Sequence, residues 1–478
     1  MNARNLSLLA VALAACAHAQ PQPAPPSANP AQVLETPPQV GPIEPFNAPV
    51  PAELKLANGL SLFTLVRPQA PLETLIFTSK HGAVHDGALP GLASLSGELL
   101  QTGSAGRSAS QIATEVAALG TSLHVGASRE DLTGILTVLP AELPQAAALL
   151  GDVMLRPNLD PKELQRTRQQ RQARLVSEAD DPHFVASRVF GTVVFGDSPY
   201  GTPLLGTQAS IAKIKLADVK RFLGKIGTQN AALFAAGPVP AEQLQALLDK
   251  AFGAAQPGQA EAPIKATPAS HRPALVLVDK PGAPQSVLRM GEPSVAIHSP
   301  DRWALELDNL VFGGSFTSRI NQNLREKHGY TYGARSDFQM LRGGGAFLAA
   351  ADVKTSVTAA SIKELQGELA RMAQSGLSPE ELTKSRALFA AGLVQELQTT
   401  PGTAQAIAEL WADELPLDDL AKVLPALKQL DLAAVNAAWN RAVNPQAMTL
   451  VVVGDAKSVK SQLQAAGLPA PTELAAPR

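Results

Sequence analysis

The feature that most constrains the fold is an internal repeat. The segments 159–164 (LDPKEL) and 377–382 (LSPEEL) each open a long helix-like stretch, and their prolines lie 218 positions apart (379 minus 161). An Asp or Ser followed by Pro and then acidic residues is the usual start of a helix. Strand-like runs at 231–237 and 449–454 end at glycines with nearly the same offset, 217 (454 minus 237). Two landmarks with one offset predict a chain built from two related halves.

Each half mixes strand-like and helical runs. Apolar runs rich in β-branched residues predict strands such as 60–66 and 132–138. A period near 3.6 residues predicts helices such as 162–177 and 360–373. Because strands and helices do not alternate strictly, we predict an α+β fold of two homologous domains, each a mainly antiparallel sheet covered on one face by helices.

Composition predicts where the domains begin and end. The chain of 478 residues is long enough for two domains. Residues 20–51 are dense in Pro and Ala and predict an extended tether, and residues 254–273 have the same character and predict a linker. These stretches delimit an N-terminal domain at 52–253 and a C-terminal domain at 274–478. The formal net charge of −2 provides no basic field for a polyanion, so we expect no nucleic acid partner.

The first 19 residues are typical of an export signal. One arginine precedes an apolar run at 6–15, which small residues follow. Leu13-Ala14-Ala15-Cys16 resembles the lipobox of bacterial lipoproteins, in which the cysteine becomes the lipidated first residue, and Cys16 is the only cysteine in the chain. An ordinary signal cut after Ala19, which would discard Cys16, stays open. Either reading predicts an exported protein of the periplasm, and lipidation of Cys16 would anchor it to a membrane.

The segment 91–104 (GLASLSGELLQTGS) resembles a known zinc motif. The M16 family of metallopeptidases, which includes pitrilysin and the mitochondrial processing peptidase, carries GLAHxxEH followed by Gly-Thr or Gly-Ser. Two further blocks are similar to this family, LGTSL with SRED at 118–131 and SPYG with LG at 198–206. The resemblance covers nearly all of the mature chain and implies the family's two-domain fold.

The family's zinc chemistry is not matched in this chain. An inverted H-x-x-E-H places two histidine ligands one helical turn apart, with a glutamate as general base. Here Ser94 and Glu98 stand at the histidine positions and Gly97 at the position of the base. Counting on to the family's third ligand, a glutamate, leads to Arg174. We therefore expect no zinc in this chain.

Two histidines outside the motif are weaker candidates for a metal. His81 and His85 are four positions apart, but Gly82 between them favours a loop or strand end over a helix. No third ligand is visible in the sequence near them. We expect ordinary packed or solvated histidines.

The C-terminal half matches the family's signature, whereas the N-terminal half lacks the family's zinc ligands. Residues 312–333 (FGGSFTSRINQNLREKHGYTYG) are similar to the family's signature GGxFxSRLxxxLREKxGLxYxV. The pattern predicts a short helix that stops at Gly329 before a strand. The resemblance implies that Arg325 and Tyr332 hold the substrate backbone and stabilise the oxyanion, a role that suits guanidinium and phenol donors. The alternative is a solvated Arg325 and a packed Tyr332.

The resemblance implies a division of labour between two chains. Some members of the family are heterodimers in which one subunit carries the zinc motif and the other the Arg/Tyr pair, and this chain resembles the second kind. The implied partners are a zinc-bearing M16 subunit of similar size and a peptide or unfolded polypeptide bound at a sheet edge. Zinc is then expected in the partner and no cofactor in this chain. Two alternatives stay open: a purely structural or peptide-binding lipoprotein, and an independent peptidase with a relocated metal site.

Overall fold

The computed structural model of the chain describes residues 46–477, with 47, 261 and 263 excepted. The predicted export signal, Cys16 and most of the predicted tether lie outside these residues. Ala48 and Pro51 are buried, and Ala48 belongs to the core of the C-terminal half. The last residues of the predicted 20–51 tether therefore pack against the folded body. Every helix among the described residues is too short or too polar to span a membrane.

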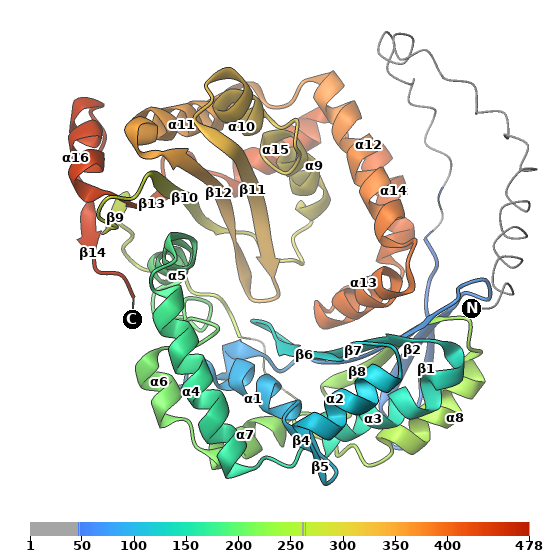
Figure 1. Ribbon diagram of the computed structural model, residues 1–478. Coiled ribbons are helices and arrows are strands. Elements are labelled where there is room, and N and C mark those ends of the chain that lie inside the picture. The colour runs from blue at the N-terminus through green and yellow to red at the C-terminus, as the bar shows by residue number, and fades with distance from the viewer. Residues whose placement is uncertain (1–45, 47, 261, 263, 478) are drawn as a thin grey trace, which may run out of the picture. The chain divides into compact units, whose positions relative to one another are not determined.

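Two six-stranded sheets form the framework (Figure 1). The first has the order β1-β2-β8-β3-β7-β6 and is antiparallel except at β2–β8. Its strands are β1 (Ala52–Lys55), β2 (Ser61–Val66), β3 (Glu73–Ser79), β6 (His124–Ala127), β7 (Leu132–Val138) and β8 (Ala231–Gly237). The second has the order β11-β12-β10-β13-β9-β14 and is parallel only around β9. Its strands are β9 (Leu275–Asp279), β10 (Gln285–Ser294), β11 (Thr331–Leu341), β12 (Gly344–Lys354), β13 (Thr449–Gly454) and β14 (Thr472–Leu474).

The strand orders confirm that the two halves are repeats. The order β2-β8-β3-β7-β6 in one sheet becomes β9-β13-β10-β12-β11 in the other, with the same parallel and antiparallel pairs. The halves differ at one edge, where β1 pairs antiparallel with β2 and β14 pairs parallel with β9. The predicted α+β class with two homologous, mainly antiparallel sheets is confirmed. A small ribbon of β4 (Gly103–Ser104) and β5 (Arg107–Ser108) completes the strands.

Most of the helices cover the outer faces of the two sheets and bury a core beneath them. Those of the N-terminal half are α1 (Leu92–Leu100), α2 (Ala109–Ala118), α3 (Leu143–Leu155), α4 (Pro161–Glu178), α5 (Pro182–Phe195), α6 (Gln208–Lys213), α7 (Leu216–Leu223) and α8 (Ala241–Phe252). Those of the C-terminal half are α9 (Arg302–Phe312), α10 (Arg319–Asn321), α11 (Thr358–Ser375), α12 (Pro379–Glu396), α13 (Thr400–Ala412), α14 (Asp419–Gln429), α15 (Leu432–Ala442) and α16 (Ala456–Ala465). The repeated motifs begin α4 and α12, where Asp160 and Ser378 cap the first turn as predicted.

The two halves exchange one helix each. Helix α5 of the N-terminal half packs on β10 and β13, and helix α13 of the C-terminal half packs on β3 and β8. The prolines Pro182 and Pro401 lie in the first turns of these helices, and the helices begin 218 positions apart (400 minus 182). The contacts are apolar on both sides, with Phe190 against the second sheet and Ile407 against the first. The inner face of each sheet is therefore covered from the other half.

Candidate functional site

A buried arginine is paired with a partly exposed glutamate at the positions that the sequence comparison assigned to the family's zinc ligands. Ser94 and Glu98 project from one face of α1, as the motif spacing predicts. Arg171 on α4 donates from Nη1 to Ser94 Oγ at 2.8 Å and from Nη2 to Glu98 Oε1 at 2.6 Å. Its Nη1 also donates to the carbonyl of Leu205 at 3.1 Å, and its side chain is only 1% exposed. The guanidinium thus ties α1 to α4.

The sequence comparison placed the third position at Arg174, whereas the arginine of α4 that reaches Ser94 and Glu98 is Arg171, three residues earlier. Arg174 lies on the solvent face of α4, where its Nε donates to Glu178 at 2.7 Å. The prediction assumed that the number of residues between the two helices is the same as in the family. The buried positions on α4 include Leu164, Thr167, Arg171 and Leu175, a 3-4-4 spacing. This helical period is the sequence signal from which Arg171 could have been recognised as the inward arginine.

The residues at this position do not fit a zinc ion. Zinc in proteins takes imidazole, thiolate or carboxylate ligands. Here a fixed positive charge lies against Ser94 and the one carboxylate, Glu98. At Gly97, the position of the base, an added Cβ would lie 3.4 Å from the backbone nitrogen of Ala127 on β6. This part of α1 packs on a strand, and the glycine at the position of the base has no side chain that could activate water.

His81 and His85 lie together but without the ligands of a metal site. Their rings stack with centroids 4.5 Å apart, and His81 also contacts the ring of Phe222. His85 ends a short 3-10 turn, in agreement with the loop that Gly82 predicted. Burial, helped by the nearby charges of His85 and Lys225, lowers the pKa of His81 to about 3. Across the described residues, no group of three His, Cys, Asp or Glu side chains is placed to hold a metal.

Arg325 lies on an unusual turn of helix. After the short α10, residues Gln322–Lys327 form a π-helix, a rare element that often marks functional sites. The Arg325 guanidinium lies over the ring of Phe316, 4.4 Å from its centroid, and its Nε is 3.6 Å from the carboxylate of Glu326. The side chain is 34% exposed. Within the described part of the chain no hydrogen bond uses its guanidinium donors, so they are available to a ligand.

Tyr332 lies on a β-bulge at the edge of the second sheet. Thr331 and Ala334 are three residues apart on β11, whereas their partners on β12 are two residues apart. The extra residue turns the side chains of this stretch out of the regular alternation. Tyr332 is 90% exposed, so it is not the packed aromatic of the alternative interpretation. The predicted strand at this point is confirmed.

Asn321 connects the elements that carry these two side chains. Its Nδ2 donates to the carbonyl of Phe316 at 3.1 Å, and its Oδ1 accepts from the backbone nitrogen of Ala334 at 2.9 Å. One buried amide therefore joins the loop under Arg325 to the strand that bears Tyr332. Neither Phe316 nor Asn321 was singled out from the sequence, although both belong to the recognised signature.

The degenerate zinc position and the Arg/Tyr pair are not joined within this chain. Ser94, Glu98 and Arg171 are all in the N-terminal half, whereas Arg325 and Tyr332 are in the C-terminal half. Among the described residues, no hydrogen bond, ion pair or ring contact links the two groups.

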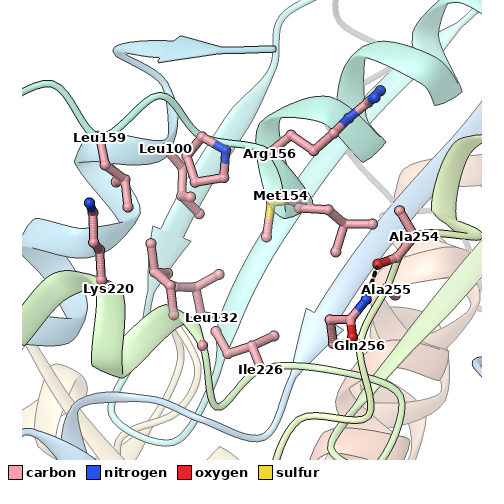
Figure 2. A pocket seen from close by; sticks show the side chains of 14 residues that line it. Leu100, Leu132, Met154, Arg156, Leu159, Lys220, Ile226, Ala254, Ala255 and Gln256 are labelled. Carbon is pink, nitrogen blue, oxygen red and sulfur yellow. Dashed lines mark hydrogen bonds between the residues drawn. The ribbon is translucent and has the colours of Figure 1, made fainter.

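Two of the cavities that lie outside these groups differ in their walls. One of 280 Å³ is lined by Leu100, Leu132 and Met154, with Lys220 and Arg156 also at its wall (Figure 2). Arg156 is paired with Asp152. No predicted site residue lines this cavity, and its wall is largely apolar.

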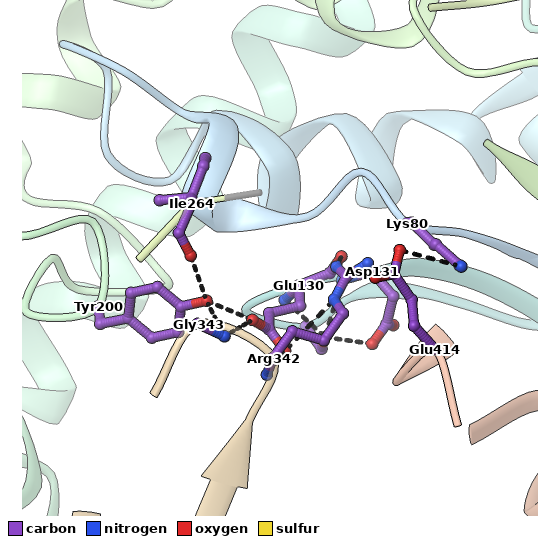
Figure 3. Close-up of polar contacts among 9 residues, drawn as sticks. Lys80, Glu130, Asp131, Tyr200, Ile264, Arg342, Gly343 and Glu414 are labelled. Atoms are coloured by element: carbon purple, nitrogen blue, oxygen red, sulfur yellow. Dashed lines mark hydrogen bonds and ion pairs between the residues drawn. The ribbon is translucent and has the colours of Figure 1, made fainter. Parts of the chain in front are cut away.

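The second cavity, of 610 Å³, lies at the junction of the two halves. A buried carboxylate, Glu130, is the centre of the contacts there (Figure 3). It accepts from the Tyr200 hydroxyl and, at 2.9 Å, from the backbone nitrogen of Arg342, while the Arg342 guanidinium donates to the Glu130 carbonyl at 2.7 Å. Burial and the hydrogen bond to Glu130 raise the pKa of Tyr200. These contacts pin the tip of the β11–β12 hairpin to the N-terminal half.

Comparison with known proteins gives the family. Residues 77–208 match the family described as Insulinase (Peptidase family M16), and residues 213–389 match the Peptidase M16 inactive domain. The chain belongs to the M16 family. An uncharacterized zinc protease of Mycobacterium tuberculosis is 25% identical over 435 residues, which are 90% of this chain and 99% of that protein. A non-peptidase homolog of Helicobacter pylori is 23% identical over 386 residues, with 79% and 88% covered.

Solved structures share the fold. An M16 inactive domain from Pseudomonas fluorescens is similar with a TM-score of 0.80 and 24% identity, over 85% of this chain and 98% of that one. A protease from Helicobacter pylori has a TM-score of 0.78 at 19% identity, with 85% and 99% covered. Both likenesses concern the arrangement of the backbone.

Proposed function

We propose that this chain is the non-catalytic subunit of a heterodimeric M16-type zinc peptidase, and that it supplies Arg325 and Tyr332 to the partner's site. The observation that carries the proposal is the contrast between the two halves. A buried guanidinium stands where a zinc ligand is needed, whereas the Arg325 donors and the Tyr332 side chain are available to a ligand. The zinc ion and the water it activates would belong to a similar-sized partner chain.

The proposed roles of Arg325 and Tyr332 follow from the hydrogen-bond donors that their side chains carry. The guanidinium of Arg325 can direct two N–H groups at one carbonyl oxygen, and the hydroxyl of Tyr332 adds a third donor. Such donors stabilise a developing oxyanion more than the neutral carbonyl, so they lower the barrier to attack on the peptide bond. The substrate would be a peptide or an unfolded polypeptide bound as an added strand.

The name of one relative supports this proposal. The Helicobacter pylori relative is named a non-peptidase homolog, and the Mycobacterium tuberculosis relative is named a zinc protease. A chain of M16 fold with an Arg/Tyr pair but no zinc ligands agrees with the first name. Proteolysis would then be a property of the assembled pair.

We also propose that the protein is exported to the periplasm and anchored through a lipid on Cys16. The sequence of the first 19 residues and the lone cysteine support this. Lipidation would place the peptidase at a membrane surface, with the Pro/Ala-rich segment between the lipid and the folded body.

Purification of the chain alone and with a zinc-bearing M16 chain from the same genome tests the function. Alone, we expect less than stoichiometric zinc by elemental analysis and no hydrolysis of an internally quenched peptide. Added to the partner, the wild type should raise turnover, and Arg325→Ala with Tyr332→Phe should lower it on the order of 100-fold, as lost oxyanion donors do. Arg441→Ala and Tyr330→Phe are matched controls.

Two outcomes would argue against this function. Stoichiometric zinc and robust hydrolysis by the isolated chain would show an independent peptidase. Normal turnover by the Arg325→Ala/Tyr332→Phe variant, in a complex that still assembles, would leave the chain a structural subunit. Size-exclusion chromatography of the mixtures separates loss of assembly from loss of turnover.

A further inference from the structure

We propose that Phe316 is a positioning residue for Arg325, and that its exposed ring holds the guanidinium in place. This inference rests on the proposed function for its consequence but not for its geometry. Phe316 is 68% exposed, so its ring lies largely outside the core. The guanidinium of Arg325 lies over this ring, 4.4 Å from the ring centroid.

The ring of Phe316 restrains the long, flexible side chain of Arg325. A free arginine side chain samples many rotamers, and fixing it for one task costs conformational entropy. Stacking on an aromatic face restrains the guanidinium through its π-system and leaves its N–H groups unused. An acidic partner would restrain it too, but would consume the donors. Glu326, at 3.6 Å, is too far for a hydrogen bond.

The loop that carries Phe316 is itself fixed. The amide of Asn321 donates to the Phe316 carbonyl at 3.1 Å. At Gly313 an added Cβ would lie 2.4 Å from the Ser336 hydroxyl, and at Gly314 it would lie 2.8 Å from the Asn309 amide, so both glycines are needed for the close packing of the loop. The backbone nitrogen of Gly314 donates to the Asn309 carbonyl at 2.6 Å. The ring therefore has a firm base on α9 and β11.

The same arrangement couples Phe316 to Tyr332. Asn321 accepts from Ala334, two residues beyond Tyr332, while it donates to Phe316. The loop, the π-helix and the bulge thus form one connected unit around two exposed side chains. In the proposed peptidase, this unit would keep Arg325 directed at the substrate carbonyl before the partner's chemistry begins, which is preorganisation.

A measurement on the isolated chain tests the geometry without any partner. In a deuterated, ¹⁵N-labelled sample, the Nε–Hε signal of Arg325 is assigned by its loss in Arg325→Lys. We expect a ring-current shift that disappears in Phe316→Leu and is kept in Phe316→Tyr. Leu474→Ala, which trims a half-exposed apolar residue elsewhere on this half, should leave the signal unchanged. An unchanged Arg325 signal in Phe316→Leu would overturn the inference.

Turnover in the assembled complex tests the consequence. Phe316→Leu should lower kcat on the order of tenfold with KM little changed, and Phe316→Tyr should restore it. In an Arg325→Ala background, Phe316→Leu should cause no further loss; a full additional tenfold loss would refute a role through Arg325. If Arg325→Ala alone leaves turnover unchanged, the proposed function fails, while the NMR shift still decides whether Phe316 positions Arg325.

Discussion

The ion pair between Arg171 and Glu98 makes an asymmetric prediction about stability. Glu98→Gln keeps the shape of the side chain but leaves the guanidinium of Arg171, 1% exposed, without a counter-charge. Arg171→Met keeps most of the apolar stem and leaves Glu98, which is 39% exposed and can be hydrated. Glu98→Gln, which keeps the buried cation of Arg171, should therefore be less stable than Arg171→Met.

The magnitudes follow from burial. Breaking a buried pair by removing one partner costs about 3–5 kcal/mol, and the partial exposure of Glu98 places Glu98→Gln near 3 kcal/mol. Arg171→Met loses the hydrogen bonds to the Leu205 carbonyl and to Ser94. Because Ser94 still bonds to the Leu204 carbonyl at 2.8 Å, the cost should be about 1–2 kcal/mol. The double variant should resemble Arg171→Met alone.

Urea unfolding followed by circular dichroism measures these differences, with Arg174→Met as the matched control on the solvent face of α4. The control should stay within about 0.5 kcal/mol of the wild type, since exposed pairs contribute little. A greater loss for Arg171→Met than for Glu98→Gln would refute the reasoning. Equal stability of Glu98→Gln and the wild type would show that the pair is not a tie between α1 and α4.

Three further predictions concern other parts of the chain. Zinc should bind tightly to the variant Ser94→His/Gly97→Glu/Glu98→His/Arg171→Glu, as measured by elemental analysis and competition with a chelator. The same variant with Arg174→Glu in place of Arg171→Glu should bind far less zinc. Equal binding would contradict the assignment of Arg171. Burial raises the pKa of Asp308 from its ordinary 3.8 to about 9, because neither oxygen has a partner in the described residues. The folded state therefore holds this proton more tightly than the unfolded state, so the stability of the wild type falls as pH rises from 3.8 towards 9. Relative to the wild type, the free energy of unfolding of Asp308→Asn should rise by about 1.4 kcal/mol per pH unit between pH 5 and 8. Parallel curves of stability against pH for the two proteins, measured by urea unfolding, would exclude this. Cys16→Ser should abolish incorporation of radiolabelled palmitate and release the protein from membranes, and unchanged fractionation would favour the ordinary signal cut.

The sequence predicted the elements with a strong local signal. Asp160 and Ser378, each before a proline, marked the starts of α4 and α12, because caps act on the first turn alone. The strands that end at Gly237 and Gly454 were equally clear from their apolar runs. Gly82 favoured a loop at the histidine pair, and the structure has a 3-10 turn there.

What the sequence did not predict depends on contacts between distant residues. Counting residues led to Arg174, whereas Arg171 is the arginine that contacts Ser94 and Glu98, and the packing of α1 on α4 decides which arginine does so. The π-helix at Arg325 and the bulge at Tyr332 arise from the fit of β11 against β12 and α10, which no local propensity encodes. The packing of α5 and α13 on the opposite sheets likewise has no signature in a window of sequence.

The placement of α5 and α13 bears on how the polypeptide reaches its native state. If the first sheet forms before α13 packs on it, the apolar surface around Phe63 and Phe234 stays uncovered until the C-terminal half is in place. A fragment that stops after α8 would keep that surface permanently open to solvent. Such a fragment should collect in inclusion bodies, and co-expression of the remaining portion should rescue it, as split proteins do when each piece completes the other.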